Sequence, residues 1–374
     1  MDYISFLFSD IYYLGIFAVI ISFILAVNMF PAIIFLAKEK DLMAVPETRS
    51  THSIKTPNLG GVGIFIAFSL SIMILGGLTN FGQLQLGQLL LLLAAITIMF
   101  FLGVKDDLIG ISPKKKFVGQ AMASIIVILL KDVRIHNLDG LFGIGELPYV
   151  ISVLVTLLVF IFIINAFNLI DGIDGLAGSI AIIASTIFGF FFMLHGNYLL
   201  MLVSFILVGA LLAFLKFNFS EKNKLFMGDS GSLFIGFLLV YQSISFMGMN
   251  TTETLWFTLP NKAVLVMAIL ALPILDTLRV FIIRISQKRS PFSADRNHIH
   301  HRLMNLGLSH KQCTLTLALA NILVIVVAFF IRKIEINIQF FIIVTLVSML
   351  GMLPFLLARE QGRIKLHAPK LKKA

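Results

Sequence analysis

Charged residues are scarce in this sequence. Asp, Glu, Lys and Arg make up only 13% of its 374 residues, while hydrophobic residues make up 59%. A typical soluble domain is about half apolar and about a quarter charged, so the composition excludes an ordinary soluble protein. Cysteine occurs once, at Cys313, which excludes an internal disulfide and a cysteine-based metal cluster. No basic run is interleaved with aromatic residues, so the net charge of +10 does not indicate a nucleic-acid partner.

Long runs without charge predict an all-α integral membrane protein, a polytopic bundle of about eleven transmembrane helices. A spanning helix needs about 20 mostly apolar residues. The candidate spans are 11–37, a pair within 56–104 divided at 76–80, 117–130, 147–170, a pair within 175–215 divided at 195–197, 230–250, 263–285, 314–331 and 336–358. Because no repeat or Pro/Gly/Ser-rich linker interrupts them, we expect one transmembrane domain over 1–374, ending in a basic cytoplasmic tail over 359–374.

Basic residues divide unevenly between the two faces that eleven spans define. The loops 38–58, 105–116, 171–174, 216–229 and 284–311, together with the tail, hold 23 Lys and Arg, whereas the opposite loops hold 5. Cytoplasmic loops carry the excess of Lys and Arg in membrane proteins. We therefore expect the first set in the cytoplasm, close to anionic membrane lipid, and the N-terminus outside.

Acidic residues are few, and their clusters fall on the basic face. Asp106 and Asp107 follow the third span and precede three consecutive lysines in one short loop. Adjacent carboxylates repel each other, so one of them needs a partner or a raised pKa. A solvated helix end explains the pair taken alone, but the lysines beside it favour a functional site.

Asn168, Asp171 and Asp174 recur at intervals of three, which places them on one face if the fifth span continues through them. Ionisable groups at such depth are costly and usually functional, although glycine-mediated helix packing with a capping Asp would also fit this segment. Asp229 stands between glycines where the eighth span begins. It either caps that helix or belongs to an anion site formed by the exposed N–H groups.

Histidines cluster in the loop before the tenth span, as His298, His300 and His301, with Arg296 and Arg302 on either side. A closed zinc site usually has four ligands, often including Cys, and flanking arginines would repel a cation. Arginine and histidine suit phosphate and sugar oxygens better. Together with the carboxylates on the same face, this loop favours magnesium-assisted phosphoryl transfer.

Five motifs follow one another along most of the chain, from about Arg49 to Leu303. They are Arg49-Ser50-x-His52 with Pro57-x-x-Gly60-Gly61, Asp106-Asp107 with Ser112-Pro113-Lys114-Lys115-Lys116-Phe117-x-x-Gln120, Asn168-Leu169-Ile170-Asp171-Gly172-x-Asp174-Gly175-Leu176, Gly228-Asp229-x-Gly231-Ser232, and His298-x-His300-His301-Arg302. This set resembles the polyprenyl-phosphate N-acetylhexosamine-1-phosphate transferases, a superfamily shared with the muramoyl-pentapeptide phosphotransferase of peptidoglycan synthesis. The last motif has the form of the N-acetylglucosamine-type enzymes.

The resemblance implies that N-acetylglucosamine-1-phosphate, or a close N-acetylhexosamine-1-phosphate, passes from a UDP-sugar to undecaprenyl phosphate with release of UMP. Carried over by motif, Asn168 and Asp229 hold Mg²⁺, for which Mn²⁺ could substitute. Asp106 and Asp107 orient or deprotonate the lipid phosphate, and Lys116 contacts phosphate. The remaining substrate-binding residues are Lys55, Asp171, Asp174, Arg284, Asp295, His298, His300, His301 and Arg302.

The resemblance also implies a multi-pass protein of the bacterial cytoplasmic (inner) membrane whose active site faces the cytoplasm. It leaves open the polysaccharide pathway, with lipopolysaccharide and teichoic acid among the choices, the hexosamine, and whether the protein is a homodimer. Within the superfamily the muramoyl-pentapeptide phosphotransferase is the alternative. A secondary transporter usually has inverted repeats, and a membrane prenyltransferase does not call for the Arg/His loop.

Overall fold

Helices make up most of the structure. The structure, a computed structural model, describes residues 10–44, 56–79, 81–249, 259–288 and 298–360. Apolar segments of this length fold as helices because a helix bonds its own N–H and C=O groups where lipid offers no partner. In chain order the elements are α2 (Ile11–Glu39), β1 (Met43–Ala44), β2 (Thr56–Pro57), α3 (Gly60–Leu78), α4 (Gln83–Ile109), α5 (Pro113–Lys131), the 3-10 turn η1 (Leu141–Gly143), α6 (Tyr149–Ile170), α7 (Leu176–Leu194), α8 (Tyr198–Asn218), α9 (Gly228–Gly248), α10 (Lys262–Ile269), α11 (Ala271–Ser286), α12 (Ile299–Asn305), α13 (His310–Phe330) and α14 (Ile336–Glu360).

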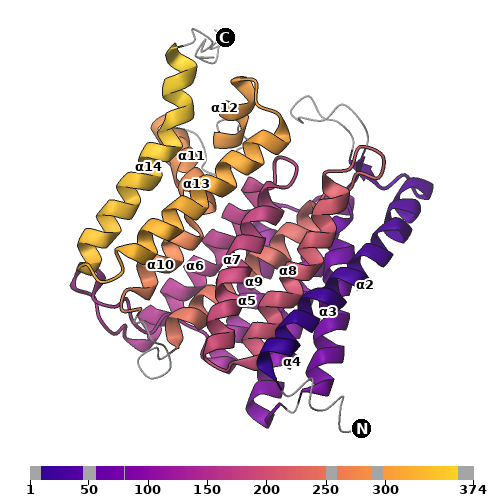
Figure 1. Ribbon diagram of the computed structural model, residues 1–374, viewed down its shortest axis with the longest axis horizontal. Coiled ribbons are helices and arrows are strands. Elements are labelled where there is room, and N and C mark those ends of the chain that lie inside the picture. Colours follow the sequence, from indigo (N-terminus) through magenta and orange to yellow (C-terminus); the bar gives the residue numbers. More distant parts are fainter. Residues whose placement is uncertain (1–9, 45–55, 80, 250–258, 289–297, 361–374) are drawn as a thin grey trace.

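The most buried helices are α8 and α9, which lie at the centre of the bundle (Figure 1). α8 packs against α2 and α7, and α9 packs against α4 and α6. The outer helices instead turn large apolar side chains outward, as Ile16, Ile20 and Ile24 do on α2. An apolar outer surface of this kind suits lipid rather than water, and the protein is a multi-pass membrane protein.

Helices lie at all eleven positions that the sequence predicts, but not all of them qualify as spans. In the described part of the chain, nine are long and apolar enough to cross a membrane, and the bent pair α10 and α11 would make ten. α5, at the predicted fourth span, has 19 residues, with three lysines directly after Pro113 and another at its end, so it has no sufficiently uncharged stretch. The all-α polytopic bundle is confirmed, whereas length and composition alone do not reach eleven spans.

The predicted ninth span is not continuous. It breaks at Leu270, where α10 and α11 meet at an angle of 76°. Pro273 lacks the N–H that would bond back to the carbonyl of Ile269, so this carbonyl has no partner within the helix. Asn321 of α13 takes over: its Nδ2 donates to Ile269 O at 3.0 Å, and its Oδ1 accepts from Leu272 N at 3.2 Å. A single buried side chain therefore satisfies both sides of the bend.

The described ends of the chain lie at opposite ends of the bundle, where α2 begins and where α14 ends (Figure 1). The short helix α12 lies near the end of α14 and packs against α13 and α14. α4 and α6 also end at this end of the bundle. α9 begins there too, because α7 runs to the far end and α8 returns. The ends of several helices thus gather the polar loops at one face of the bundle. The predicted basic tail falls almost wholly outside the described residues.

Candidate active site

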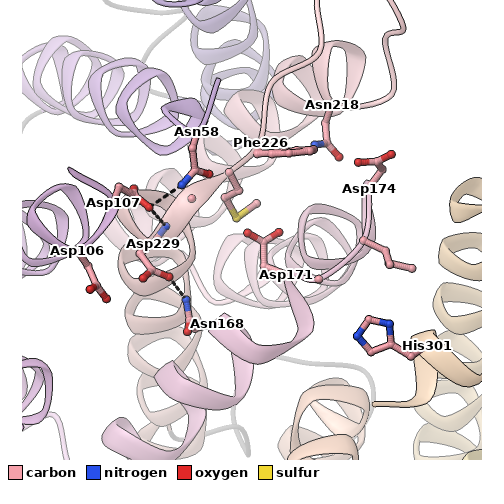
Figure 2. A pocket seen from close by; sticks show the side chains of 14 residues that line it. Asn58, Asp106, Asp107, Asn168, Asp171, Asp174, Asn218, Phe226, Asp229 and His301 are labelled. Atoms are coloured by element: carbon pink, nitrogen blue, oxygen red, sulfur yellow. Dashed lines mark hydrogen bonds between the residues drawn. The ribbon is translucent and has the colours of Figure 1, made fainter. Parts of the chain in front are cut away.

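A polar cavity of about 540 Å³ lies where these helix ends meet. It is lined by Asn58, Asp106, Asp107, Asn168, Asp171, Gly172, Ile173, Asp174, Asn218, Phe226, Met227, Gly228, Asp229 and His301. Figure 2 shows Asp171 between the group of Asp107, Asp229 and Asn168 on one side and His301 on the other. Five of the lining side chains are carboxylates, drawn from three separate segments of the chain. The cavity therefore brings together most of the acidic residues that the sequence singled out.

Asp107 joins the end of α4 to the start of α9. Its Oδ1 accepts from the backbone N–H of Asp229 at 2.8 Å, and its Oδ2 accepts from that of Ser230 at 2.9 Å. Asn58 Nδ2 also donates to Asp107 Oδ1, at 2.9 Å. The first N–H groups of a helix have no partner within it and favour a negative charge. Asp107 thus caps α9 from another helix and holds the backbone of Asp229 in place.

Lys116 lies between two carboxylates. Its Nζ is 2.8 Å from Asp106 Oδ2 and 3.1 Å from Asp229 Oδ2. The other oxygen of Asp229 accepts from Asn168 Nδ2, which also donates to Ser232 Oγ at 2.7 Å. Side chains of α4, α5, α6 and α9 therefore converge on Asp229.

One turn deeper in the bundle, an amide pair joins α5 to α6. Asn165 Nδ2 donates to Gln120 Oε1 at 2.8 Å, and Gln120 Nε2 donates to Asn165 Oδ1 at 3.3 Å. Gln120 follows Lys116 by four residues and Asn165 precedes Asn168 by three, so each amide lies on the same helix face as a site residue. The pair fixes the relative height of the two helices at which Lys116 and Asn168 both reach Asp229.

The predicted magnesium ligands, Asn168 and Asp229, are hydrogen-bonded to each other. Within the described residues no group of three His, Cys, Asp or Glu side chains is arranged to hold a metal ion by itself. Mg²⁺ does not need one, because it usually binds through one or two carboxylates together with substrate phosphates and water. A half-turn of the Asn168 amide exchanges its nitrogen and oxygen and would present the oxygen to a cation. The donor set at this end of the cavity therefore fits Mg²⁺.

The histidine segment forms α12, on the wall of the cavity opposite Asp229. His301 lines the cavity, whereas His298 and His300 are buried behind it. Burial, and then the neighbouring His301, lowers the pKa of His300 to about 3, so its imidazole is neutral. Of the predicted histidines, the described structure thus places only His301 at the cavity.

The other predicted substrate-binding residues stand away from the cavity or outside the described residues. Arg284 is 2% exposed, near the end of α11. The Arg302 guanidinium lies over the Phe355 ring, with its carbon 5.2 Å from the ring centroid. Lys55 and Asp295 lie outside the described residues. Substrate contacts by these four residues remain predictions.

Comparison with known proteins places the chain in a family. The family model described as glycosyl transferase family 4 matches residues 89–247. The decaprenyl-phosphate N-acetylglucosaminephosphotransferase of Mycolicibacterium smegmatis is 32% identical over 294 residues, which cover 74% of this chain and 72% of that protein. This chain belongs to glycosyl transferase family 4. It is a sugar-phosphate transferase, as the sequence motifs predicted.

Two further relatives of this transferase extend the similarity over more of the chain. The probable undecaprenyl-phosphate N-acetylglucosaminyl 1-phosphate transferase of Bacillus subtilis is 30% identical over 334 residues, 88% of each chain. The undecaprenyl-phosphate alpha-N-acetylglucosaminyl 1-phosphate transferase of Salmonella typhimurium is 28% identical over 311 residues, 80% of each chain. The similarity therefore covers the cavity and most of the helices around it.

Asp171 and Asp174 do not share a helix face, and that prediction is wrong. α6 ends at Ile170, and the chain turns before α7, with Gly175 at a φ of +78°. Positive φ is open to glycine at little cost but strained for other residues, so Gly175 allows the chain to turn into α7 after α6 has ended. Both carboxylates still line the cavity, because the turn forms part of its wall.

The turn holds the two carboxylates in different surroundings. Asp174 Oδ2 lies 2.6 Å from Lys224 Nζ and 3.1 Å from His310 Nδ1. Burial alone would raise the pKa of Asp174, but the hydrogen bonds from His310 and Lys224 outweigh burial and lower it. Asp171 has no side-chain hydrogen bond to any other described residue, and burial together with the nearby carboxylates raises its pKa well above the usual value. Asp174 is an anchor in the fold, whereas Asp171 is available to a ligand.

Asparagine at these two positions should change stability in opposite directions. Asp174→Asn should lower the free energy of unfolding by about 1–3 kcal/mol, because it removes charged hydrogen bonds from Lys224 and His310. That stability is present above the ordinary Asp pKa and lost only as pH falls through the lowered folded pKa. Asp171→Asn should raise stability, and more at pH 8 than at pH 5, because ionising a carboxyl whose folded pKa is raised destabilises the fold. Thermal unfolding in detergent at both pH values measures this, and shifts of the same sign would contradict the assignment.

Sequence reasoning missed several residues that shape this site. Asn58 lies inside the Pro57-x-x-Gly60-Gly61 motif, so its position could have marked it. Lys224 and His310, which hold Asp174, are 50 and 136 residues from it along the chain. No local pattern connects residues so far apart, and only the fold reveals their contact.

Proposed function

We propose that this transferase moves N-acetylglucosamine-1-phosphate from UDP-N-acetylglucosamine to undecaprenyl phosphate and releases UMP. The observation that carries the proposal is the convergence of Lys116, Asn168 and two carboxylates on one end of a polar cavity of about 540 Å³. The names of the relatives indicate the substrates: a polyprenyl phosphate and N-acetylglucosamine phosphate. A cavity of this size suits a nucleotide-sugar, since small-molecule sites are typically about 300–1,000 Å³.

The reaction is a displacement at phosphorus. An oxygen of the acceptor phosphate attacks the phosphorus that carries the sugar, and the bond from that phosphorus to the bridging oxygen of the diphosphate breaks. UMP leaves with that oxygen, and the lipid diphosphate sugar remains in the membrane. A phosphate monoester has a second pKa near 6 and is mostly a dianion at neutral pH, so it needs little help from a base. Asp106 and Asp107 then act chiefly by positioning Lys116 and the start of α9.

Charge balance supports a divalent cation. Two phosphate-bearing substrates would enter a cavity lined by five carboxylates, and Lys116 is already shared between Asp106 and Asp229. We propose that Asn168 and Asp229 hold Mg²⁺, or Mn²⁺ in its place, which would supply Lewis-acid stabilisation of charge on the transferred phosphoryl group. His301, across the cavity, would face the diphosphate or the sugar.

The orientation in the membrane follows from the charge of the loops. The cavity lies on the face that carries 23 of the Lys and Arg residues, so we propose that it faces the cytoplasm across the inner membrane, with the N-terminus outside. The nucleotide-sugar would then reach it from the cytoplasm and the acceptor from the bilayer. Reporter fusions after Ala374 should read as cytoplasmic, and an external reading would overturn the orientation.

The experiment for the reaction measures UMP release from three donors, each with and without undecaprenyl phosphate. We expect acceptor-dependent UMP from UDP-N-acetylglucosamine and at least tenfold less from UDP-N-acetylgalactosamine and UDP-N-acetylmuramoyl-pentapeptide, the donor of the muramoyl alternative. Chelation of divalent cations should abolish release, and added Mg²⁺ should restore it. Turnover that survives complete chelation would refute the metal proposal, and preference for the pentapeptide donor would refute the sugar assignment.

A further inference from the structure

Asp276 is a carboxylate buried within α11, 1% exposed, that the reaction does not use directly. Its Oδ2 lies 2.8 Å from His298 Nδ1, and its Oδ1 accepts from the backbone N–H of Ile299 at 2.9 Å. Arg279, one turn later, lies 3.1 Å from Oδ1. Burying a carboxylate is expensive unless partners surround it, and here two of those partners are the N-cap and the first residue of α12.

These contacts fix both the start of α12 and the form of one histidine. His298 is the N-cap of α12, with extended backbone, and Ile299 is its first residue. Since a carboxylate only accepts, His298 must carry a proton on Nδ1 when it bonds to Asp276. Asp276 therefore fixes both the direction in which the chain enters α12 and the tautomer of His298.

The position of α12 is linked to the cavity through three neighbouring imidazole rings. The rings of His298 and His300 are nearly parallel, at 7° and 5.6 Å between centroids, and the rings of His300 and His301 are 4.4 Å apart. His300 Nε2 packs against Gly172 so closely that a Cβ added there would lie 2.7 Å from it. His301, next in sequence, lines the cavity. Asp276 at one end and the turn after α6 at the other thus confine the segment that presents His301.

A second set of contacts holds α12 on the side that faces α14. Phe355 of α14 is close to two guanidinium groups: the guanidinium carbon of Arg279 lies 4.5 Å from its ring centroid, and that of Arg302 lies 5.2 Å from it. Arg279 also pairs with Asp276, so the ion pair and the aromatic contact share one arginine. α11, α12 and α14 are joined at this point, and Arg279 takes part in both the ion pair with Asp276 and the contact with Phe355.

We propose that Asp276 is a positioning residue for the transferase: it acts through His298 and α12 to place His301 against the cavity. The kinetic part rests on the proposed function. Asp276→Asn should lower kcat with UDP-N-acetylglucosamine by about tenfold to 100-fold, the usual cost of losing a group that orients a functional histidine. The KM for the lipid acceptor should stay within about twofold, because α12 lies across the cavity from Asp106 and Asp107.

A double-mutant cycle separates positioning from general destabilisation. If Asp276 acts through His301, Asp276→Asn should add little to the loss already caused by His301→Ala, whereas independent sites give additive losses. Asp132→Asn, a carboxylate paired with Arg134 on the opposite face, is the control and should not couple to His301→Ala. Additive losses for Asp276→Asn and His301→Ala would overturn the proposal.

Hydrogen exchange tests, without any substrate, whether Asp276 holds α12 in place. In the wild type the Ile299 amide should exchange slowly; in Asp276→Ala the amides of α12 should exchange faster while those of α13 stay unchanged. If wild-type protein released no UMP, the proposed function would fail while this measurement still decided the anchoring of α12. Unchanged exchange in α12 would refute the anchoring of α12 by Asp276, even if the enzyme were fully active. Asp276→Asn, which keeps an oxygen for Ile299, provides a milder variant if Asp276→Ala does not fold.

Discussion

Asp229→Asn should lower kcat by about 10²–10³-fold, the size of effect seen when one preorganised stabilising group is removed from an active site. Asparagine keeps the shape but removes the charge that Lys116 contacts at 3.1 Å and that Asn168 hydrogen-bonds. It also removes the proposed carboxylate ligand of Mg²⁺. The start of α9 should remain intact, because Asp107 bonds to the backbone N–H of residue 229 rather than to its side chain. UMP release gives kcat, and thermal unfolding reports whether the variant folds.

The part of this loss of kcat that comes from metal binding can be measured separately. Added Mg²⁺ should raise the unfolding temperature of the wild type in the presence of UMP and have little effect on Asp229→Asn, since binding to the folded state alone stabilises it. Asp132→Asn is the matched control: this residue caps the far end of α5 in the left-handed region, which asparagine tolerates. Its kcat should stay within about twofold of the wild type. Near-normal turnover by Asp229→Asn would remove Asp229 from the mechanism.

Gly103→Ala should lower kcat by about 100-fold and also destabilise the protein by about 1–3 kcal/mol. A Cβ on residue 103 would lie 2.4 Å from both the carbonyl oxygen of Asp229 and the Cα of Ser230. These are backbone atoms at the start of α9 and cannot turn aside, so α4 and α9 must separate. Asp106 and Asp107 lie on the next turn of α4 and would move with it. Misplacement of catalytic groups by about 1 Å can cost about two orders of magnitude in rate.

Gly77→Ala provides the control for the same chemical change. Residue 77 lies near the end of α3, and a Cβ there would meet no atom within 4 Å. Alanine is favoured over glycine in a helix by about 0.5–1 kcal/mol, so this variant should be equally active and slightly more stable. Activity assays and unfolding of the two variants side by side measure the difference. Full activity in Gly103→Ala would show that close approach of α4 and α9 does not set the geometry around Asp229.

The helices could be predicted from the sequence because a membrane span is recorded locally, as a long uncharged run. The turns at 195–197 and the position of the break between α3 and α4 follow from small and polar residues in such runs. The acidic residues of the cavity could be found in the same way, since charge is rare enough here to mark function. Family motifs then assigned the reaction, and similarity to known transferases confirms the family.

The partners of those residues could not be predicted, because each lies on a different helix. Asp276 was visible as a charge within a span, but its bonds to His298 and Ile299 depend on how the chain returns after α11. The bend at Leu270 could have been suspected from Pro273, yet its stability depends on Asn321, 48 residues beyond Pro273. The histidine motif suggested that any of its three imidazoles could meet substrate, and burial separates His301 from the other two. Such distinctions arise from packing, which a sequence pattern does not record.

The bend between α10 and α11 is held by hydrogen bonds to α13. Asn321 grips the backbone on both sides of it, at Ile269 and Leu272, so opening or closing the angle would break two buried hydrogen bonds at once. A change in the angle between α10 and α11 is therefore coupled to the position of α13. α12, which bears His301, is in turn bonded to α11 through Asp276. Any movement of α11 would therefore carry α12 and His301 with it, and the bonds of Asn321 at the bend oppose such a movement.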